Sequence, residues 1–117
     1  MSINLGANRR RVPRREFKAG VGILYQGHYA VGRSLQVGEG GMSLVSEFAY
    51  RENDLVILTF QIPEGSLMCV RATVRYSKSD EITDAAAVGF EFAKVDFHFK
   101  RELRNFVARA TQENISF

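Results

Sequence analysis

Hydrophobic and polar residues alternate along much of this sequence, and a period of two is typical of a half-buried β-strand. The strongest example covers residues 68–77. One face of this segment carries Met68, Val70, Ala72, Val74 and Tyr76, and the other carries Cys69, Arg71, Thr73, Arg75 and Ser77. We therefore predict a strand here, with the first face in a core and the second toward water.

Five more segments have strand character, and runs of turn residues separate them. They lie at about residues 20–25, 29–37, 42–45, 55–62 and 86–92. Segment 55–62 begins apolar on both faces, which predicts a central or well-covered strand. In segment 29–37 the residues expected on one face are Tyr29, Val31, Leu35 and Val37. Residues 63–66 form the clearest turn, and loops are predicted at residues 46–54 and 77–84.

The pattern changes from strand to helix after Val95. Asp96 is a good N-cap residue, and apolar residues then recur at steps of three and four, at Phe99, Leu103, Phe106, Val107 and Ala110. This spacing predicts an amphipathic helix over about residues 96–112. Six short antiparallel strands tend to close into a barrel, because closure removes exposed edges. We therefore predict a mainly β fold, a six-stranded antiparallel β-barrel with a C-terminal α-helix and a flexible basic N-terminal arm.

Positive charge is concentrated at the N-terminus. Residues 1–18 contain six basic residues and one acidic residue, a net charge of +5. The remaining ten basic and twelve acidic residues give residues 19–117 a net charge of −2. A chain of 117 residues supports one domain, so we divide it into a basic arm (1–18) and a single barrel-and-helix domain (19–117). This charge asymmetry predicts a polyanionic partner.

Several classes of protein are disfavoured by what the sequence lacks. No apolar run reaches about 18 residues and none follows the N-terminal charges, so we expect a cytoplasmic protein without membrane insertion or secretory signal. Cys69, in the middle of a predicted strand, is expected to be a buried or half-buried inert thiol. His28 and His98 have no partner at ligand spacing, so no metal site is predicted. Because no signature such as G-x-S-x-G occurs, we predict that the protein is not an enzyme.

The arginine cluster of the arm is the first of two candidate binding segments. Arg10 and Arg14 are four residues apart, as are Arg11 and Arg15. Guanidinium groups match phosphate oxygens, and they also match the O6 and N7 acceptors of guanine. Judged by charge alone, a basic tail without a specific ligand explains the arginine cluster as well as a binding segment does.

The second segment is Gln36-Val37-Gly38-Glu39-Gly40-Gly41, which ends one predicted strand and precedes another. Its glycines allow a ligand to approach the backbone closely, and the Gln36 amide can pair with the edge of a base. By itself, an ordinary hairpin turn is the better explanation of these residues. A G-x-G-x-x-G motif is absent and no helix follows, so a Rossmann dinucleotide site is not predicted.

Taken together, the two segments resemble the motifs of the PilZ domain family. In that family an R-x-x-x-R motif and an N/D-x-S-x-x-G turn, on a six-stranded barrel with a C-terminal helix, bind the bacterial second messenger cyclic di-guanosine monophosphate (c-di-GMP). Residues 9–14 look like the first motif, and residues 36–41 occupy the place of the second. Segment 87–92 is also similar to the family's last barrel strand. The resemblance covers about residues 9–110.

The resemblance implies a c-di-GMP receptor and no other cofactor. Its ligand-binding residues would be Arg9, Arg10, Arg11, Arg14, Gln36, Gly38 and Gly41. Arg10 and Arg14 would contact guanine edges and phosphates. Ligand binding would order the arm and change the surface presented to an unidentified protein partner, for example in the control of motility. Both a monomer and a homodimer fit this reading.

The second motif departs from the family's pattern. Gln36 stands at the position of Asp or Asn, Gly38 stands at the position of Ser, and only Gly41 matches. Gly38 removes a hydroxyl with its hydrogen bond, and the longer Gln36 must reach a base differently. The alternative is therefore a PilZ-fold adaptor that does not bind c-di-GMP and acts through protein contacts.

A nucleic-acid polymer is a third candidate partner, which the basic arm favours. The acidic body disfavours it, and so do the aromatic residues, because they fall on predicted core stripes instead of an exposed stacking surface. These residues are Phe90, Phe92, Phe99 and Phe106.

Overall fold

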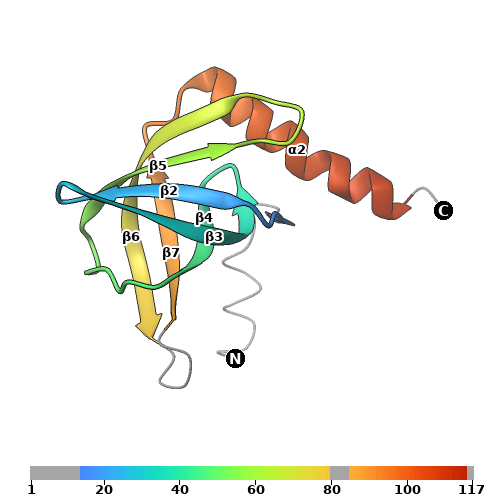
Figure 1. The fold of residues 1–117 in the computed structure, drawn as a ribbon. Helices are drawn as coiled ribbons and strands as arrows, with labels where there is room; N and C mark the ends of the chain where they lie inside the picture. Colours follow the sequence, from blue (N-terminus) through green and yellow to red (C-terminus); the bar gives the residue numbers. More distant parts are fainter. Residues whose placement is uncertain (1–13, 80–84, 116–117) are drawn as a thin grey trace, which may run out of the picture.

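The computed structural model describes residues 14–79 and 85–115, with side chains as far as residue 109. In this part of the chain, seven strands and one helix follow one another (Figure 1). They are β1 (Arg14–Glu16), β2 (Gly20–Tyr25), β3 (His28–Gly38), β4 (Gly41–Ser46), β5 (Leu55–Gln61), β6 (Leu67–Ser79), β7 (Ala86–Ala93) and α2 (Phe97–Ile115). All strand pairings are antiparallel.

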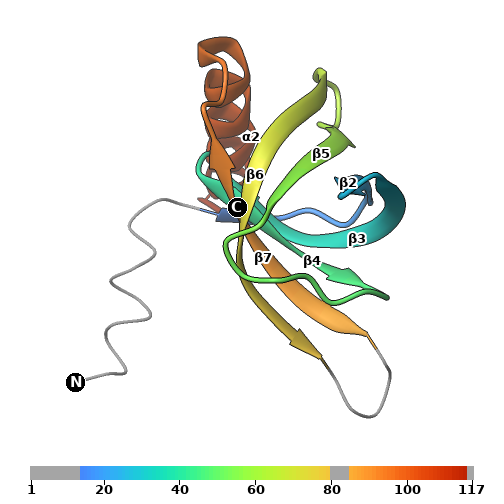
Figure 2. The same ribbon diagram turned by 90° about the vertical axis from the view of Figure 1, so that its left-hand side faces the viewer.

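Strands β2 to β7 form a closed barrel, as predicted. The sheet order is β1-β3-β2-β5-β6-β7-β4, and a further pairing of β3 with β4 closes the ring. Closure depends on the length of β3, because residues 28–33 pair with β2 and residues 33–37 pair with β4. The short β1 pairs with residues 36–38 of β3. Figure 2 shows the strands curving around one another, with α2 to one side of the barrel.

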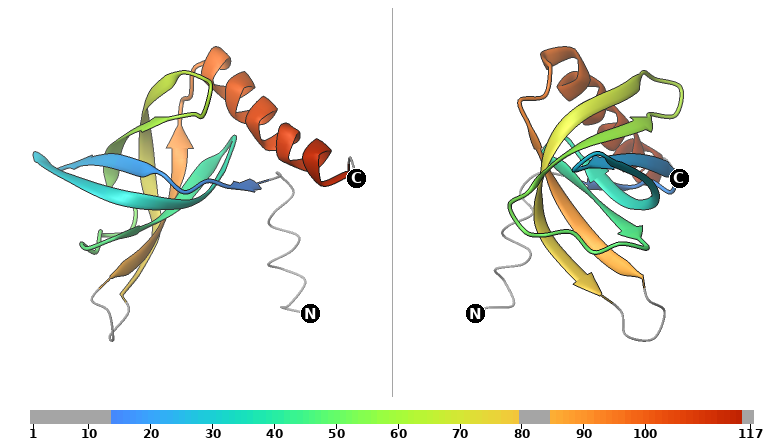
Figure 3. Two further views of the ribbon diagram at one scale, coloured as in Figure 1. Left: turned by 45° about the vertical axis from the view of Figure 1, so that its right-hand side comes forward. Right: turned by 60° about the vertical axis from the view of Figure 1, so that its left-hand side comes forward.

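The hairpins and the helix project from the barrel in different directions. In Figures 1 and 3 the β2–β3 hairpin points to one side, while the paired end of β6 and start of β7 extend in another direction, away from α2. The turn between β2 and β3 is the two-residue loop Gln26-Gly27, and both residues have positive φ, 50° and 81°. Positive φ at both positions matches the twist of a tight antiparallel hairpin, and glycine adopts it readily.

The C-terminal helix matches its predicted amphipathic pattern as far as residue 109, and Ala110 of the predicted stripe lies outside the described side chains. Asp96 caps its start, because the Asp96 Oδ1 accepts a hydrogen bond from the backbone N–H of His98 at 2.7 Å. Leu103, Phe106 and Val107 are buried against the barrel. The helix extends to Ile115, a few residues beyond the predicted end.

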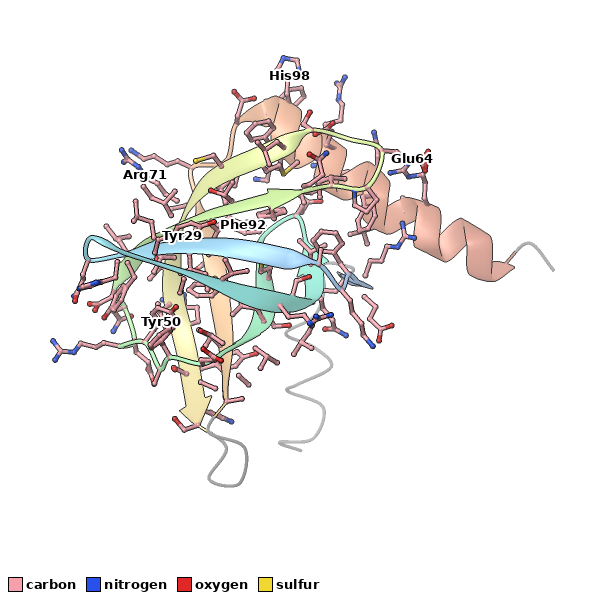
Figure 4. The ribbon with its side chains drawn as sticks, in the orientation of Figure 1. Tyr29, Tyr50, Glu64, Arg71, Phe92 and His98 are labelled. Atoms are coloured by element: carbon pink, nitrogen blue, oxygen red, sulfur yellow. The ribbon has the colours of Figure 1, made fainter. Side chains whose placement is uncertain are left out.

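Two β-bulges move residues off the faces that simple alternation predicts. In β3 the register shifts between Ser34 and Gln36, so Tyr29 and Val31 point outward while Val37 is buried. An extra residue in a strand reverses the faces of the residues beyond it. The prediction that Tyr29, Val31, Leu35 and Val37 share one face is therefore wrong. Figure 4 shows Tyr29 near the β2–β3 hairpin, outside the barrel wall.

The second bulge lies in β6, between Val74 and Tyr76. Met68 and Val74 are buried, as the alternation predicts. Tyr76, predicted on the same face, instead points outward and is 39% exposed. Strand β6 also continues to Ser79, so residues 77–79 are strand and not loop, because they pair with the first residues of β7.

Two further predictions on β5 and β6 are wrong. The outer face of β5 is not covered by other described residues, since Leu55 and Ile57 are exposed while Val56 and Leu58 between them are buried. Cys69 is exposed, because it lies on the outward face of β6. In a barrel wall only the inner face is covered by the core, so an apolar residue of the outer face meets water.

Candidate functional site

Arg14, the described residue of the first motif, and the glycines of the second motif line one cavity of about 490 Å³ on the outside of the barrel. The lining residues come from β1, the β3–β4 turn and the strands β4, β6 and β7. They are Arg14, Gly38, Gly40, Gly41, Met42, Arg75, Tyr76, Gly89, Phe90 and Glu91. Three of the predicted ligand-binding residues therefore line one cavity, namely Arg14, Gly38 and Gly41. Arg9, Arg10 and Arg11 lie outside the described residues.

Pairing between β1 and β3 positions Arg14. Arg14 lies opposite Gly38, and Glu16 lies opposite Gln36 in the same short ladder. Neighbouring strands are about 4.8 Å apart, so the backbone of Arg14, the last residue of the R-x-x-x-R motif, runs directly beside Gly38 at the start of the glycine turn. Arg14 is thus part of an extended strand, and it lines the cavity.

Arg15 is held on a different surface from Arg14. Its Nη1 donates a hydrogen bond to the backbone carbonyl of Phe106 at 3.0 Å, and its guanidinium carbon lies 4.1 Å from the centre of the Phe106 ring. This geometry is that of a cation–π contact. Because successive side chains of a strand point to opposite faces, one arginine serves the cavity and the next attaches β1 to α2.

The residues that follow β1 are anchored in the core. The ring of Phe17 packs edge-on against Phe60 and Phe106, with centroids 6.2 and 5.6 Å apart. The buried Ser34 hydroxyl accepts a hydrogen bond from the backbone N–H of Ala19 at 3.0 Å and donates one to the carbonyl of Phe17. These contacts keep β1 against β3, and they thereby keep Arg14 at the cavity.

The glycine turn brings backbone, not side chains, to the cavity. At Gly41 a Cβ atom would collide with the carbonyl oxygen of Phe90, and at Gly40 it would have nothing within 4 Å. Gly41 is therefore required by close packing of β4 on β7, while Gly40 leaves the turn open. Gln36 is half-buried within β3, paired in register with Glu16 and Ser43, and it is not among the lining residues.

Glu39, in the same turn, reaches toward α2. Arg104 donates two hydrogen bonds to its carboxylate, from Nε to Oε2 at 3.0 Å and from Nη2 to Oε1 at 3.2 Å. The hydrogen bonds from Arg104 hold the pKa of Glu39 below its ordinary value, and the carboxylate raises the pKa of Arg104. Arg104 is 61% exposed, so water screens the pair and its main effect is to orient the turn.

Replacing Arg104 with alanine should raise the pKa of Glu39 toward its ordinary value. A depressed pKa stabilises the fold above the unfolded-state pKa of the carboxyl, and that contribution is lost as pH falls through the folded-state value. NMR titration of the Glu39 carboxyl carbon measures the change. Arg101→Ala, on the same helix but stacked near Phe97, is the control that should leave this pKa unchanged. An unshifted Glu39 in Arg104→Ala would contradict the pairing.

Part of the cavity wall consists of residues of β6 and β7 that the sequence did not single out. The Arg75 Nε donates to Oε1 of Glu91 at 2.5 Å, and its Nη2 donates to the same oxygen. The ring of Tyr76 lies against Gly89, where a Cβ atom would collide with it. The signal available in the sequence was weak, since alternation does not reveal that a bulge brings Tyr76 to the same outward face as Arg75.

Neither a cluster of metal-binding side chains nor a membrane-spanning helix occurs among the described residues. Between residues 14 and 109, apart from 80–84, no three or more His, Cys, Asp or Glu side chains gather where they could hold a metal ion. Figure 4 shows His98 at the start of α2, pointing away from the barrel. Within the same described part of the chain, no helix combines the length and apolarity needed to cross a membrane.

Comparison with known proteins agrees with the motifs and the fold. The family profile of the PilZ domain matches residues 8–109. Among solved structures, the Bacillus subtilis inhibitor of motility MotI (DgrA) is similar, with a TM-score of 0.79 and 17% identity over 90% of this chain and 52% of that chain. The PilZ domain of Escherichia coli YcgR with c-di-GMP gives a TM-score of 0.70 and 16% identity over 92% and 97%. The K. pneumonia MrkH–c-di-GMP complex gives 0.71 and 14% over 91% and 54%.

The profile match covers most of the sequence, so the chain belongs to the PilZ domain family. This is a family of c-di-GMP-binding domains. At these identities the solved structures show the fold alone, and the chain spans about half the length of MotI and of MrkH. No curated protein sequence matches the chain.

Proposed function

We propose that this protein is a c-di-GMP receptor that binds its ligand in the cavity between β1, the β3–β4 turn and β7. The observation that carries the proposal is that Arg14 and the glycine turn, one from each motif, line the same cavity. Membership of the PilZ family supports this assignment. So do the structures of YcgR and MrkH, which hold c-di-GMP on the same fold.

The chemistry of the cavity suits a cyclic dinucleotide. The guanidinium of Arg14 offers a fork of donors that matches a phosphate group or the O6 and N7 of guanine. Gly38 and Gly40 let a ligand approach the backbone without meeting a side chain. Arg9, Arg10 and Arg11 precede Arg14 in the same basic segment. We assign Arg10, like Arg14, to guanine edges and phosphates, and Arg9 or Arg11 to further phosphate contacts.

The receptor acts on a protein partner and has no catalytic role in this proposal. Ligand binding orders the arm ahead of Arg14, and β1 is attached to α2 through Arg15 and Phe106. A change at the cavity can therefore alter the surface formed by the arm and the helix. This mechanism is an order–disorder switch, in which ligand contacts fix a segment that a partner then recognises.

Calorimetric titration of the protein with c-di-GMP at moderate salt tests the proposal. We expect saturable binding, with chemical-shift changes at the amides of residues 38–41 and 89–91. The absence of both heat and shift changes at near-millimolar ligand would overturn it.

A second candidate function is a PilZ-fold adaptor that binds a protein partner without c-di-GMP. The specific observation in its favour is the departure of Gln36 and Gly38 from the family's second motif. Titration of the double variant Gln36→Asp/Gly38→Ser distinguishes the two candidates. Binding by the double variant alone supports the adaptor, whereas binding by the unaltered protein supports the receptor.

A further inference from the structure

The cavity contains a carboxylate in a position that the sequence motifs do not include. Glu91 carries the single carboxylate among the lining residues. In the ladder between β4 and β7 it lies directly opposite Gly41, the last residue of the second motif. The side chain of Glu91 is 53% exposed, so a ligand in the cavity can reach it.

The second motif itself brings no acceptor side chain to this cavity. Gly38, Gly40 and Gly41 have no functional group, and Gln36 is not among the lining residues. The carboxylate of Glu39 is bound to Arg104 on α2. An acceptor for the base must therefore come from elsewhere if the cavity is to recognise guanine.

Glu91 is held in place by Arg75, which lies on the outward face of β6 beside the bulge. Both hydrogen bonds from Arg75 end on one oxygen of the carboxylate, Oε1. A carboxylate offers about four acceptor positions, so about two remain for a ligand.

Tyr76 gives the same wall a flat apolar surface. Its ring covers the backbone of Gly89 and is 39% exposed. Every base has a π-face that can stack on such a ring. The bulge thus brings an aromatic ring to the same outward face as the orienting guanidinium, next to a carboxylate on the neighbouring strand.

Resting on the proposed function above, we propose that Glu91 recognises a guanine base of c-di-GMP, in place of the Asp or Asn of the second motif. The Watson–Crick edge of guanine presents two kinds of donor, N1–H and N2–H₂, and an ionised carboxylate accepts from both. Adenine presents an acceptor at N1, which would face the carboxylate unfavourably. Arg75 is a positioning residue in this assignment, and Tyr76 stacks on the base.

The test compares two ligands that differ by one donor. Cyclic di-inosine monophosphate retains N1–H, O6 and N7 but lacks the N2 amino group of c-di-GMP. We expect the unaltered protein to prefer c-di-GMP by about 10- to 150-fold, the range for a hydrogen bond to a charged group. In Glu91→Gln the preference should fall to about 2- to 10-fold, as for a neutral hydrogen bond, and in Glu91→Ala it should vanish.

Two control variants separate base recognition from general effects. Glu52→Gln makes the same charge change on an exposed loop residue that does not line the cavity, and it should leave both affinities unchanged. Tyr76→Ala should weaken both ligands by the same factor, because stacking does not depend on the N2 group. Unchanged thermal unfolding of Glu91→Ala would show that the variant is folded.

The outcomes distinguish this inference from the proposed function. If the unaltered protein binds neither ligand, the receptor function is overturned and the role of Glu91 with it. If it binds c-di-GMP and Glu91→Ala keeps the full preference over the inosine analogue, only the role of Glu91 is overturned. Equal weakening of both ligands in Glu91→Ala would also overturn it, since the carboxylate would then not recognise the base.

Discussion

Replacing Arg14 with alanine should weaken c-di-GMP binding by about 10- to 150-fold. Arg14 is the arginine of the first motif that the structure places at the cavity, opposite Gly38. Its hydrogen bonds to a phosphate or to guanine are bonds of a charged group, worth about 1.5–3 kcal/mol, and each 1.4 kcal/mol is about a factor of ten. Isothermal titration calorimetry measures the loss directly.

Two matched variants show whether the loss belongs to the cavity. Arg14→Lys keeps the charge but not the planar fork, so it should recover only part of the affinity. Arg51→Ala removes an exposed arginine in the loop after β4, away from the cavity, and should change little. The salt dependence should also become shallower in Arg14→Ala, because one ionic contact fewer is screened. Equal losses in Arg14→Ala and Arg51→Ala would show that only net charge attracts the ligand.

Replacing Phe106 with alanine should lower the free energy of unfolding by about 3–5 kcal/mol, the range for a large aromatic side chain removed from a core. Phe106 is only 3% exposed, packs against Phe17 and lies under the guanidinium of Arg15. Its removal leaves a cavity between α2 and the segment that follows β1. Since small domains have about 5–15 kcal/mol of stability, this loss is large, and urea unfolding measures it.

Phe97→Ala is the control for this variant. Phe97 is the first residue of the same helix and is 65% exposed, so its truncation should change stability by less than about 0.5 kcal/mol. A Phe106→Ala protein that unfolds at the same urea concentration as Phe97→Ala would contradict the packing described here. It would mean that α2 does not hold β1 in place.

The sequence predicted the barrel because most of its strands obey simple alternation. Residues 68–74 alternate as predicted, and Val88, Phe90 and Phe92 share the buried face of β7. The helix could be predicted equally well, since its N-cap at Asp96 and its apolar stripe are both local sequence signals. Local patterns of this kind predict which residues are buried, and the buried residues form the inner face of a small barrel.

The errors arise where a β-bulge interrupts the regular alternation of buried and exposed residues. A bulge adds one residue without any signature in composition, so alternation misplaces Tyr29 and Tyr76. The meeting of Arg75 with Glu91 depends on strand register, and the position of Tyr76 opposite Gly89 depends on the bulge. Neither register nor bulge is visible in a single sequence. For the same reason, the arginine cluster could not be divided in advance into Arg14 at the cavity and Arg15 on the helix.

The shared use of β3 has a consequence for heat resistance. Strand β3 closes the ring with β4 and also pairs with β1. If the barrel opened between β3 and β4, Arg14 on β1 would separate from the cavity residues on β4 and β7. A ligand that bridges Arg14 and those residues binds the folded chain and not the unfolded one. By mass action, a concentration 100 times the dissociation constant adds about 2.7 kcal/mol to the stability of the fold. The signalling nucleotide would then protect the whole domain from thermal denaturation and proteolysis, so the amount of receptor in a cell would rise with the level of its own signal.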